Sequence, residues 1–86
     1  MKIRTAYGSV ISQARYARGL SLRETAELAQ ISYNYLHEIE KGKKEASSEF
    51  LGYILTALHM PPVEFFTRVA NEYQRLADQY HASVAK

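Results

Sequence analysis

The stretch LSLRETAELAQISYNYLHEIEKGKK, residues 20–44, contains the signals for two short helices joined by a tight turn. Ser21 precedes a run of helical periodicity and has Glu24 three residues later, which is the pattern of a capping box and predicts a helix start. Ser32 can cap a second helix in the same way, and Gly42 ends it. Two short helices around a turn of this length predict a helix-turn-helix unit.

The second of these helices has a narrow apolar side. At 100° per residue, Tyr35, Leu36 and Ile39 fall together and are expected to face the protein interior. The opposite side carries side chains that form hydrogen bonds, namely Tyr33, Asn34, His37, Glu38 and Lys41. A helix of about two turns with so little apolar surface is stable only when other helices pack on its apolar side. We therefore expect a helix bundle from which the polar side of this helix protrudes.

The rest of the chain is also typical of helices, and no stretch alternates cleanly enough for a strand. The first helix is expected to end at Gly19, and either Ser47 or Ser48 opens a fourth helix whose inner face carries Leu51, Ile54, Leu55 and Leu58. Pro62 suits the first turn of a last helix that could run to about residue 83. The sequence therefore predicts an all-α bundle of five helices, the last one elongated.

Composition narrows the classes of protein. With 86 residues the chain is one domain, or one domain with an arm. It has no cysteine, which excludes disulfides and thiolate chemistry. No apolar run approaches the ~20 residues that span a bilayer, and the first residues lack the apolar core of a secretory signal. We therefore expect a cytoplasmic protein without membrane contact.

The charge is small but unevenly distributed. The formal net charge is +2, yet residues 1–23 contain five basic side chains and no acidic one. This excess indicates a polyanionic partner, although a surface that is uneven by chance is the alternative.

Motifs for catalysis are absent from the sequence. The run HEIEK, residues 37–41, begins like the zinc motif H-E-x-x-H but has Lys41 where the second histidine is needed. His59 and His81 are expected to be ordinary surface or cap histidines. No nucleophile triad, glycine-rich phosphate loop or carboxylate pair stands out. We expect no enzyme activity, metal site, cofactor or small-molecule ligand.

The outward side of residues 33–41 is suited to reading double-stranded DNA. The major groove is ~12 Å wide and admits one helix, whose first turn meets the base edges. Asn34 can form a bidentate contact with adenine, and Glu38 can accept from cytosine. The predicted base-reading residues are Ser32, Tyr33, Asn34, His37 and Glu38.

Phosphate contacts are expected on either side of this helix. The lysines that follow it form a basic cluster, and Ser47 marks a helix start where free N–H groups favour an anion. The alternative for the lysines is a solvated loop without function. The predicted phosphate-contacting residues are Ser21, Arg23, Lys41, Lys43, Lys44 and Ser47.

The chain carries a family resemblance in GLS (19–21), Ala26, IS (31–32) and YLHEIEKGKK (35–44). The chain resembles the Cro/cI-type helix-turn-helix domain of the XRE family over residues 4–66. This resemblance implies a five-helix lambda-repressor-like fold and DNA binding. Residues 40–58 further resemble ClgR-like regulators of actinobacteria, which implies an activator of genes of the Clp protease system. The sequence itself does not separate activation from repression.

The same resemblance implies a structural ion pair and shows one departure. In the family, an arginine and a glutamate at the positions of Arg15 and Glu40 form a partly buried pair; the alternative is two unrelated surface charges. The family often holds a phosphate with glutamine where this chain has Leu22. Either Arg23 or the backbone N–H groups capped by Ser21 would then bind the phosphate.

Beyond residue 62 the apolar residues follow a heptad pattern. Phe66, Val69, Tyr73, Leu76 and Tyr80 recur at alternating spacings of three and four. Phe65, Phe66 and Val69 are expected to pack on the domain, and an exposed remainder is typical of an interface. We therefore predict a DNA-binding domain at 4–66 and an extension at 67–86 that forms a homodimer through Val69, Tyr73, Leu76 and Tyr80.

Two alternatives remain open for this extension. The last helix could fold back on its own domain. The chain could also be an antitoxin or another protein-binding helix-turn-helix module whose last helix grips a different protein.

Overall fold

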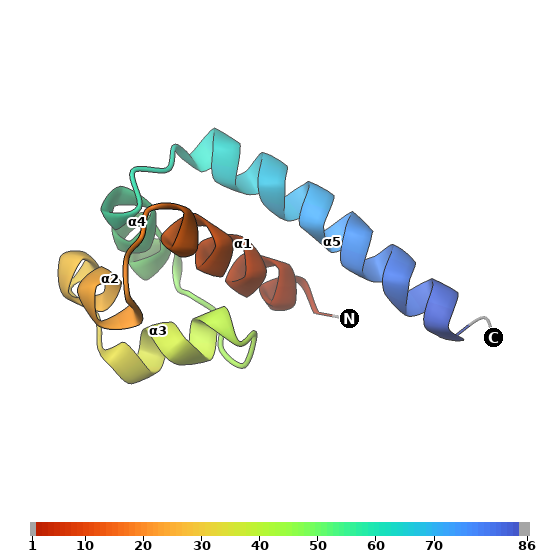
Figure 1. Ribbon diagram of the computed structural model, residues 1–86, viewed down its shortest axis with the longest axis horizontal. Helices are drawn as coiled ribbons and strands as arrows, with labels where there is room; N and C mark the ends of the chain where they lie inside the picture. Colours follow the sequence, from red (N-terminus) through yellow and green to blue (C-terminus); the bar gives the residue numbers. More distant parts are fainter. Residues whose placement is uncertain (1, 85–86) are drawn as a thin grey trace.

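The computed structural model describes residues 2–84, and of residues 82–84 it describes the backbone alone. This part of the chain folds into five α-helices with no strand (Figure 1). The helices are α1 (Ile3–Ala17), α2 (Leu22–Ala29), α3 (Tyr33–Glu40), α4 (Ser48–Ala57) and α5 (Pro62–Val84). The predicted fold class is confirmed, because α5 is 23 residues long and the other four helices form the bundle beside it.

The helix boundaries follow from local capping chemistry. Ser21, Ser32 and Ser47 each accept a hydrogen bond from the backbone N–H three residues later, so Ser47 rather than Ser48 opens α4. The capping box of Ser21 and Glu24 is complete. Gly19 and Gly42 have φ of 68° and 74°, left-handed values that stop α1 and α3 and that glycine adopts at little cost.

The core lies where α1 packs on α3 and α5 and where α2 packs on α3 and α4. Its largest fully buried side chains include Ile11, Leu36, Ile54 and Phe65, which come from four different helices. Each such side chain contributes about 1.5–3 kcal/mol through burial. In Figure 1, α1 runs between α5 on one side and α3 on the other. The packing therefore leaves the outward side of α3 free and keeps it apart from α5.

Gly8 permits the close contact between α1 and α3. A Cβ atom at this position would lie 2.3 Å from the carbonyl oxygen of Ile39 and 2.6 Å from that of Glu40. Both obstacles are backbone atoms near the end of α3, which cannot turn aside as a flexible side chain could. The position of α3 therefore depends on the absence of a side chain at residue 8.

We expect Gly8→Ala to destabilise the fold by about 2–3 kcal/mol, because the added methyl group must push α3 away from α1. Gly52→Ala is the matched control. It lies within α4, where nothing stands within 4 Å of the new Cβ, and it should stabilise the helix by about 0.5–1 kcal/mol. Urea unfolding of both variants measures the difference. Equal stability of the two variants would contradict the close contact.

Glu72 joins α5 to α1. Its residue is 8% exposed, and its carboxylate accepts hydrogen bonds from Ser9 and Gln13 of α1 and from Arg75 one turn further along α5. The Gln13 bond is 3.1 Å long, and the bond from Arg75 Nε is 2.8 Å long. The hydrogen bond from Arg75 and then that from Ser9 lower the pKa of Glu72 from 4.5 to about 2.

This pKa predicts a loss of stability in acid. A carboxyl group with a lowered pKa in the folded state stabilises the protein above pH 4.5, and the contribution is lost as the pH falls from 4.5 toward 2. Half of the Arg75 side chain is exposed and screened by solvent, so we expect about 1–2 kcal/mol. The difference in unfolding free energy between the wild-type chain and Glu72→Gln should shrink over this range. A difference that is independent of pH would refute the assignment.

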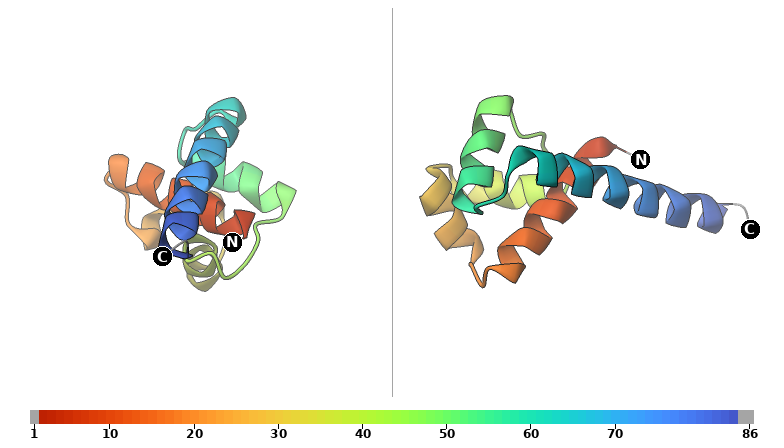
Figure 2. Two further views of the ribbon diagram at one scale, coloured as in Figure 1. Left: turned by 90° about the vertical axis from the view of Figure 1, so that its right-hand side faces the viewer. Right: turned by 90° about the horizontal axis from the view of Figure 1, so that it is seen from above.

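The second half of α5 extends away from the bundle, as the views in Figure 2 show. The molecule measures 44 × 25 × 24 Å. Val69 is 3% exposed and belongs to the chain's own core, which leaves it little surface for a second copy. Tyr73 packs partly on the core, Leu76 is half-buried, and Tyr80 is 56% exposed. Residues 85 and 86 of the predicted extension lie outside the described residues.

Candidate nucleic-acid interface

The predicted base-reading residues share the outward side of α3. Ser32, Tyr33 and Asn34 are exposed, while His37 and Glu38 are half-buried. The inner side is closed by two buried residues, Leu36 and Ile39. The structure therefore brings all five predicted residues onto one accessible surface of a helix that is braced from behind.

Three of the predicted contact residues form a stack across α2 and α3. The guanidinium of Arg23 lies over the ring of Tyr33, 5.4 Å from its centroid. The Tyr33 ring in turn stacks on His37 with 6.0 Å between the centroids and 24° between the planes. A cation over an aromatic face is attracted by the ring quadrupole. The contact between Arg23 and Tyr33 joins α2 to the outward side of α3, and no spacing rule in the sequence indicates it.

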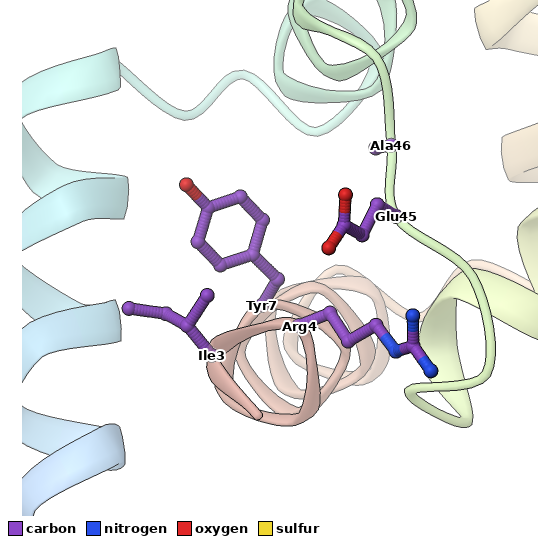
Figure 3. Close-up of a pocket in the computed structure, with 5 residues that line it drawn as sticks. All are labelled: Ile3, Arg4, Tyr7, Glu45 and Ala46. Carbon is purple, nitrogen blue, oxygen red and sulfur yellow. The ribbon is translucent and has the colours of Figure 1, made fainter. Parts of the chain in front are cut away.

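The loop after α3 carries the lysine cluster and is attached to the body at several points. Arg4 Nε donates to the carbonyl oxygen of Gly42 at 3.0 Å, and Figure 3 shows the Arg4 side chain reaching from α1 toward this loop. The hydroxyl of Tyr35 donates to the carbonyl of Glu45 at 3.2 Å and accepts from the N–H of Ser47 at 3.4 Å. The attachments hold the loop backbone in place while Lys41, Lys43 and Lys44 stay exposed.

Two of the predicted phosphate contacts are already used within the chain. Ser21 and Glu24 satisfy each other at the start of α2, and the hydrogen bond from the Ser21 backbone lowers the pKa of Glu24. Ser47 accepts from the N–H of Phe50 at 3.2 Å. The hydroxyl hydrogens of both serines remain available to a phosphate oxygen, but the ionised Glu24 makes the start of α2 less attractive to an anion.

The predicted ion pair of Arg15 and Glu40 is present. Arg15 Nε lies 2.8 Å and Nη2 3.0 Å from the two carboxylate oxygens, so the pair is bidentate. Each side chain is only 7% exposed. Arg15 also donates to the carbonyl of Leu20 at 2.8 Å, and its hydrogen bond to Glu40 raises the pKa of Arg15. The pair joins α1 to the end of α3, next to the contact at Gly8.

Other candidate sites in the described part of the chain are small or lack ligands. Residues 2–81, whose side chains the structure describes, bring no group of three potential metal ligands together. None of the described helices combines the length and the apolar character needed to cross a membrane. A shallow pocket of about 200 Å³ lies between the start of α1 and the loop after α3 (Figure 3). Arg4 and Glu45 line it together with Ile3, Tyr7 and Ala46.

The family assignment agrees with this geometry. Residues 6–65 match the family model described as the helix-turn-helix domain. This chain belongs to that family. It is 48% identical over 59 residues to the transcriptional regulator ClgR of Mycobacterium tuberculosis (strain ATCC 25618 / H37Rv). That match covers 69% of this chain and 53% of the relative, so the chain spans about half the length of the curated relatives it matches.

Solved structures resemble the chain over most of its length. The clp gene regulator ClgR from Corynebacterium glutamicum has a TM-score of 0.86 at 33% identity, covering 98% of this chain and 90% of that one. The restriction-modification controller protein C.Esp1396I, solved as a tetramer with its 35-base-pair operator, has a TM-score of 0.78 at 21% identity, covering 84% and 95%. The second likeness concerns the fold alone. The predicted resemblance to ClgR-type regulators is confirmed.

Proposed function

We propose that this helix-turn-helix protein binds a specific double-stranded DNA site as a homodimer and regulates transcription. The observation that carries the proposal is the outward side of α3. Five polar residues project there from a helix that is held by Gly8, the Arg15–Glu40 pair and a buried apolar side. The exposed lysine loop follows directly and suits the flanking phosphates.

The residues divide into two roles. In the proposed complex Ser32, Tyr33, Asn34, His37 and Glu38 face base edges in the major groove. Arg23 and the three lysines face phosphate, with the hydroxyls of Ser21 and Ser47 as further donors. Arg23 also positions Tyr33 through the stack. Residues 4–66 form the DNA-binding unit, and residues 67–86 provide the contact between subunits.

The name of a relative supports a proposal for the regulated genes. The solved relative from Corynebacterium glutamicum is named a clp gene regulator, so we propose that this chain acts on genes of a protease or stress response. Activation fits the ClgR-like resemblance. The position of the operator relative to the promoter decides between activation and repression.

Selection of bound sites from random duplex DNA tests this function. The selected site should be an inverted repeat, because two subunits related by a two-fold axis present equal surfaces. Each neutralised phosphate contributes about −0.9 to the slope of log K against log salt, so a dimer should give a slope of roughly −5 or steeper. Failure to enrich any sequence, together with a flat salt response, would reject DNA binding.

Mutations of base-reading residues and of phosphate-contacting residues should affect DNA binding in different ways. Asn34→Ala should weaken binding to the selected site by about 1–3 kcal/mol and binding to random DNA little. Lys43→Ala should weaken both alike and lower the salt slope by about 1. Fluorescence anisotropy on the two duplexes at several salt concentrations measures these effects. An Asn34→Ala variant that loses equal affinity for both would show that Asn34 does not read a base.

A protein-binding module remains the second candidate, because Phe66 and Tyr80 leave large apolar side chains exposed on α5. Variants that neutralise the outward side of α3 separate the two functions. A module that binds a different protein keeps its activity in such variants, whereas a DNA reader loses it.

A further inference from the structure

The hydrogen bonds of Glu72 have no part in the proposed DNA contacts, yet they join α5 to α1 of the DNA-binding unit. Among residues 62–81 of α5, whose side chains the structure describes, Glu72 is the last buried residue. Before it, Phe65 and Val69 attach α5 to the core through apolar packing. Beyond it, α5 continues for twelve residues to Val84, about 18 Å at 1.5 Å per residue. Figure 1 shows this part leaving the bundle.

Apolar packing alone leaves α5 freer to tilt than the observed contacts do. Phe65 and Val69 are buried in the core and Tyr73 packs partly on it, so the apolar contacts span about 12 Å along the helix. Glu72 lies within this span and adds hydrogen bonds to Ser9 and Gln13, whose directional geometry a tilt of α5 would disturb. These bonds connect α5 to the helix that also positions α3 through Gly8 and the Arg15–Glu40 pair.

In a dimer joined through α5, the tilt of this helix determines how far apart the two α3 helices lie. A tilt of roughly 10° moves the far end of the 18 Å long part of α5 beyond Glu72 by about 3 Å. That displacement is close to the rise of one base pair, since a turn of 10–10.5 base pairs measures about 34–36 Å. If this part of α5 tilted freely, the dimer would absorb the shift that a one-base-pair change in half-site spacing brings, and the change would cost less affinity.

We propose that Glu72 is a positioning residue for operator selection, and that its bonds to Ser9 and Gln13 set the half-site spacing that the dimer accepts. The inference rests on the proposed function. It assigns the choice of spacing to a residue outside the DNA-reading surface. Arg75 is not required for this role, because it bonds to Glu72 from the same helix and does not connect α5 to α1.

The experiment measures affinity for the selected inverted repeat and for versions with one base pair inserted or deleted at its centre. The wild-type dimer should lose about 30-fold or more on the altered spacings, because one base pair shifts a half-site by about 3.4 Å and rotates it by about 35°. Glu72→Ala should stay dimeric and folded but lose less than about 5-fold. The double substitution Ser9→Ala and Gln13→Ala removes the α1 side of the contact and should behave in the same way.

Two further variants separate positioning from general stability. Glu72→Gln retains an oxygen that can accept from Ser9 and Gln13, so it should keep the wild-type preference. Arg75→Ala removes only the bond within α5 and should also keep it. Light scattering and circular dichroism confirm the dimer and the helix content of each variant.

The outcomes distinguish this inference from the proposed function. A Glu72→Ala dimer with the full spacing preference would overturn the role of Glu72, as would a wild-type dimer that tolerates every spacing. A wild-type chain that is monomeric or binds no inverted repeat would instead overturn the proposed function, and the inference with it.

Discussion

Replacing Leu76 with aspartate is expected to separate the subunits and to weaken operator binding by two orders of magnitude or more. Leu76 is half-buried in the single chain and lies between Tyr73 and Tyr80 on the arm of α5. In the proposed two-fold interface each Leu76 lies near its own copy, so the variant would bring two carboxylates together in an apolar contact. One subunit with a short α3 reaches only a few base pairs, and its affinity should fall by at least about 2.7 kcal/mol.

Light scattering measures the oligomeric state, and titration with operator DNA measures the affinity. Two further variants, Tyr80→Asp and Asn71→Asp, make the test more specific. An aspartate at residue 76 would also lie one turn from Glu72 and repel it. Tyr80→Asp places the charge two turns from Glu72 and should give the same monomer. Asn71→Asp is the control, because it adds a carboxylate to an exposed position on a different side of α5. If Leu76→Asp and Tyr80→Asp remained dimeric at micromolar concentration and bound the operator tightly, the subunits would meet elsewhere.

Removing either partner of the Arg15–Glu40 pair is expected to cost about 3–5 kcal/mol, a large share of the stability of a domain of this size. Both side chains are 7% exposed, so the partner left behind would be a buried charge without its counterion. The loss should also reach DNA binding, because the pair joins α1 to the end of α3.

A double-mutant cycle with alanine at both positions isolates the pair. The loss in the double variant should fall short of the sum of the single losses by about 1 kcal/mol or more, because removing both charges leaves neither one unpaired. Denaturant unfolding of the four chains gives the coupling. Additive losses would mean that the two side chains contribute independently, in spite of their bidentate geometry.

Much of the fold could be read from the sequence because its signals are local. A serine cap acts on an N–H three residues away, and a glycine with positive φ ends a helix at its own position. Ser21, Ser32 and Gly42 therefore placed α2 and α3 correctly. The outward side of α3 could be predicted from the helical period alone. This short helix has few apolar residues, and they all fall on one side, so the opposite side must face outward.

The sequence was less informative about α5. Its heptad pattern identified the apolar residues but not what covers them. The spacing of residues shows which side chains share one side of a helix, and it does not show which partner packs on that side. Val69 belongs to the core of its own chain, whereas Tyr80 remains exposed. The resemblance implied the Arg15–Glu40 pair, and its burial and bidentate geometry came from the structure.

Sequence alone determined the number of helices, most of their limits and the outward side of α3, because these depend on residues within about one turn of each other. The tertiary structure decided the contacts between residues far apart in the chain. The carbonyls of Ile39 and Glu40 show why residue 8 is glycine, and Ser9 and Gln13 show why an acidic side chain is buried at residue 72. The Arg23–Tyr33 contact likewise exists only once α2 and α3 pack together. Such contacts depend on how the helices pack against each other, and the spacing of residues within one helix does not show this.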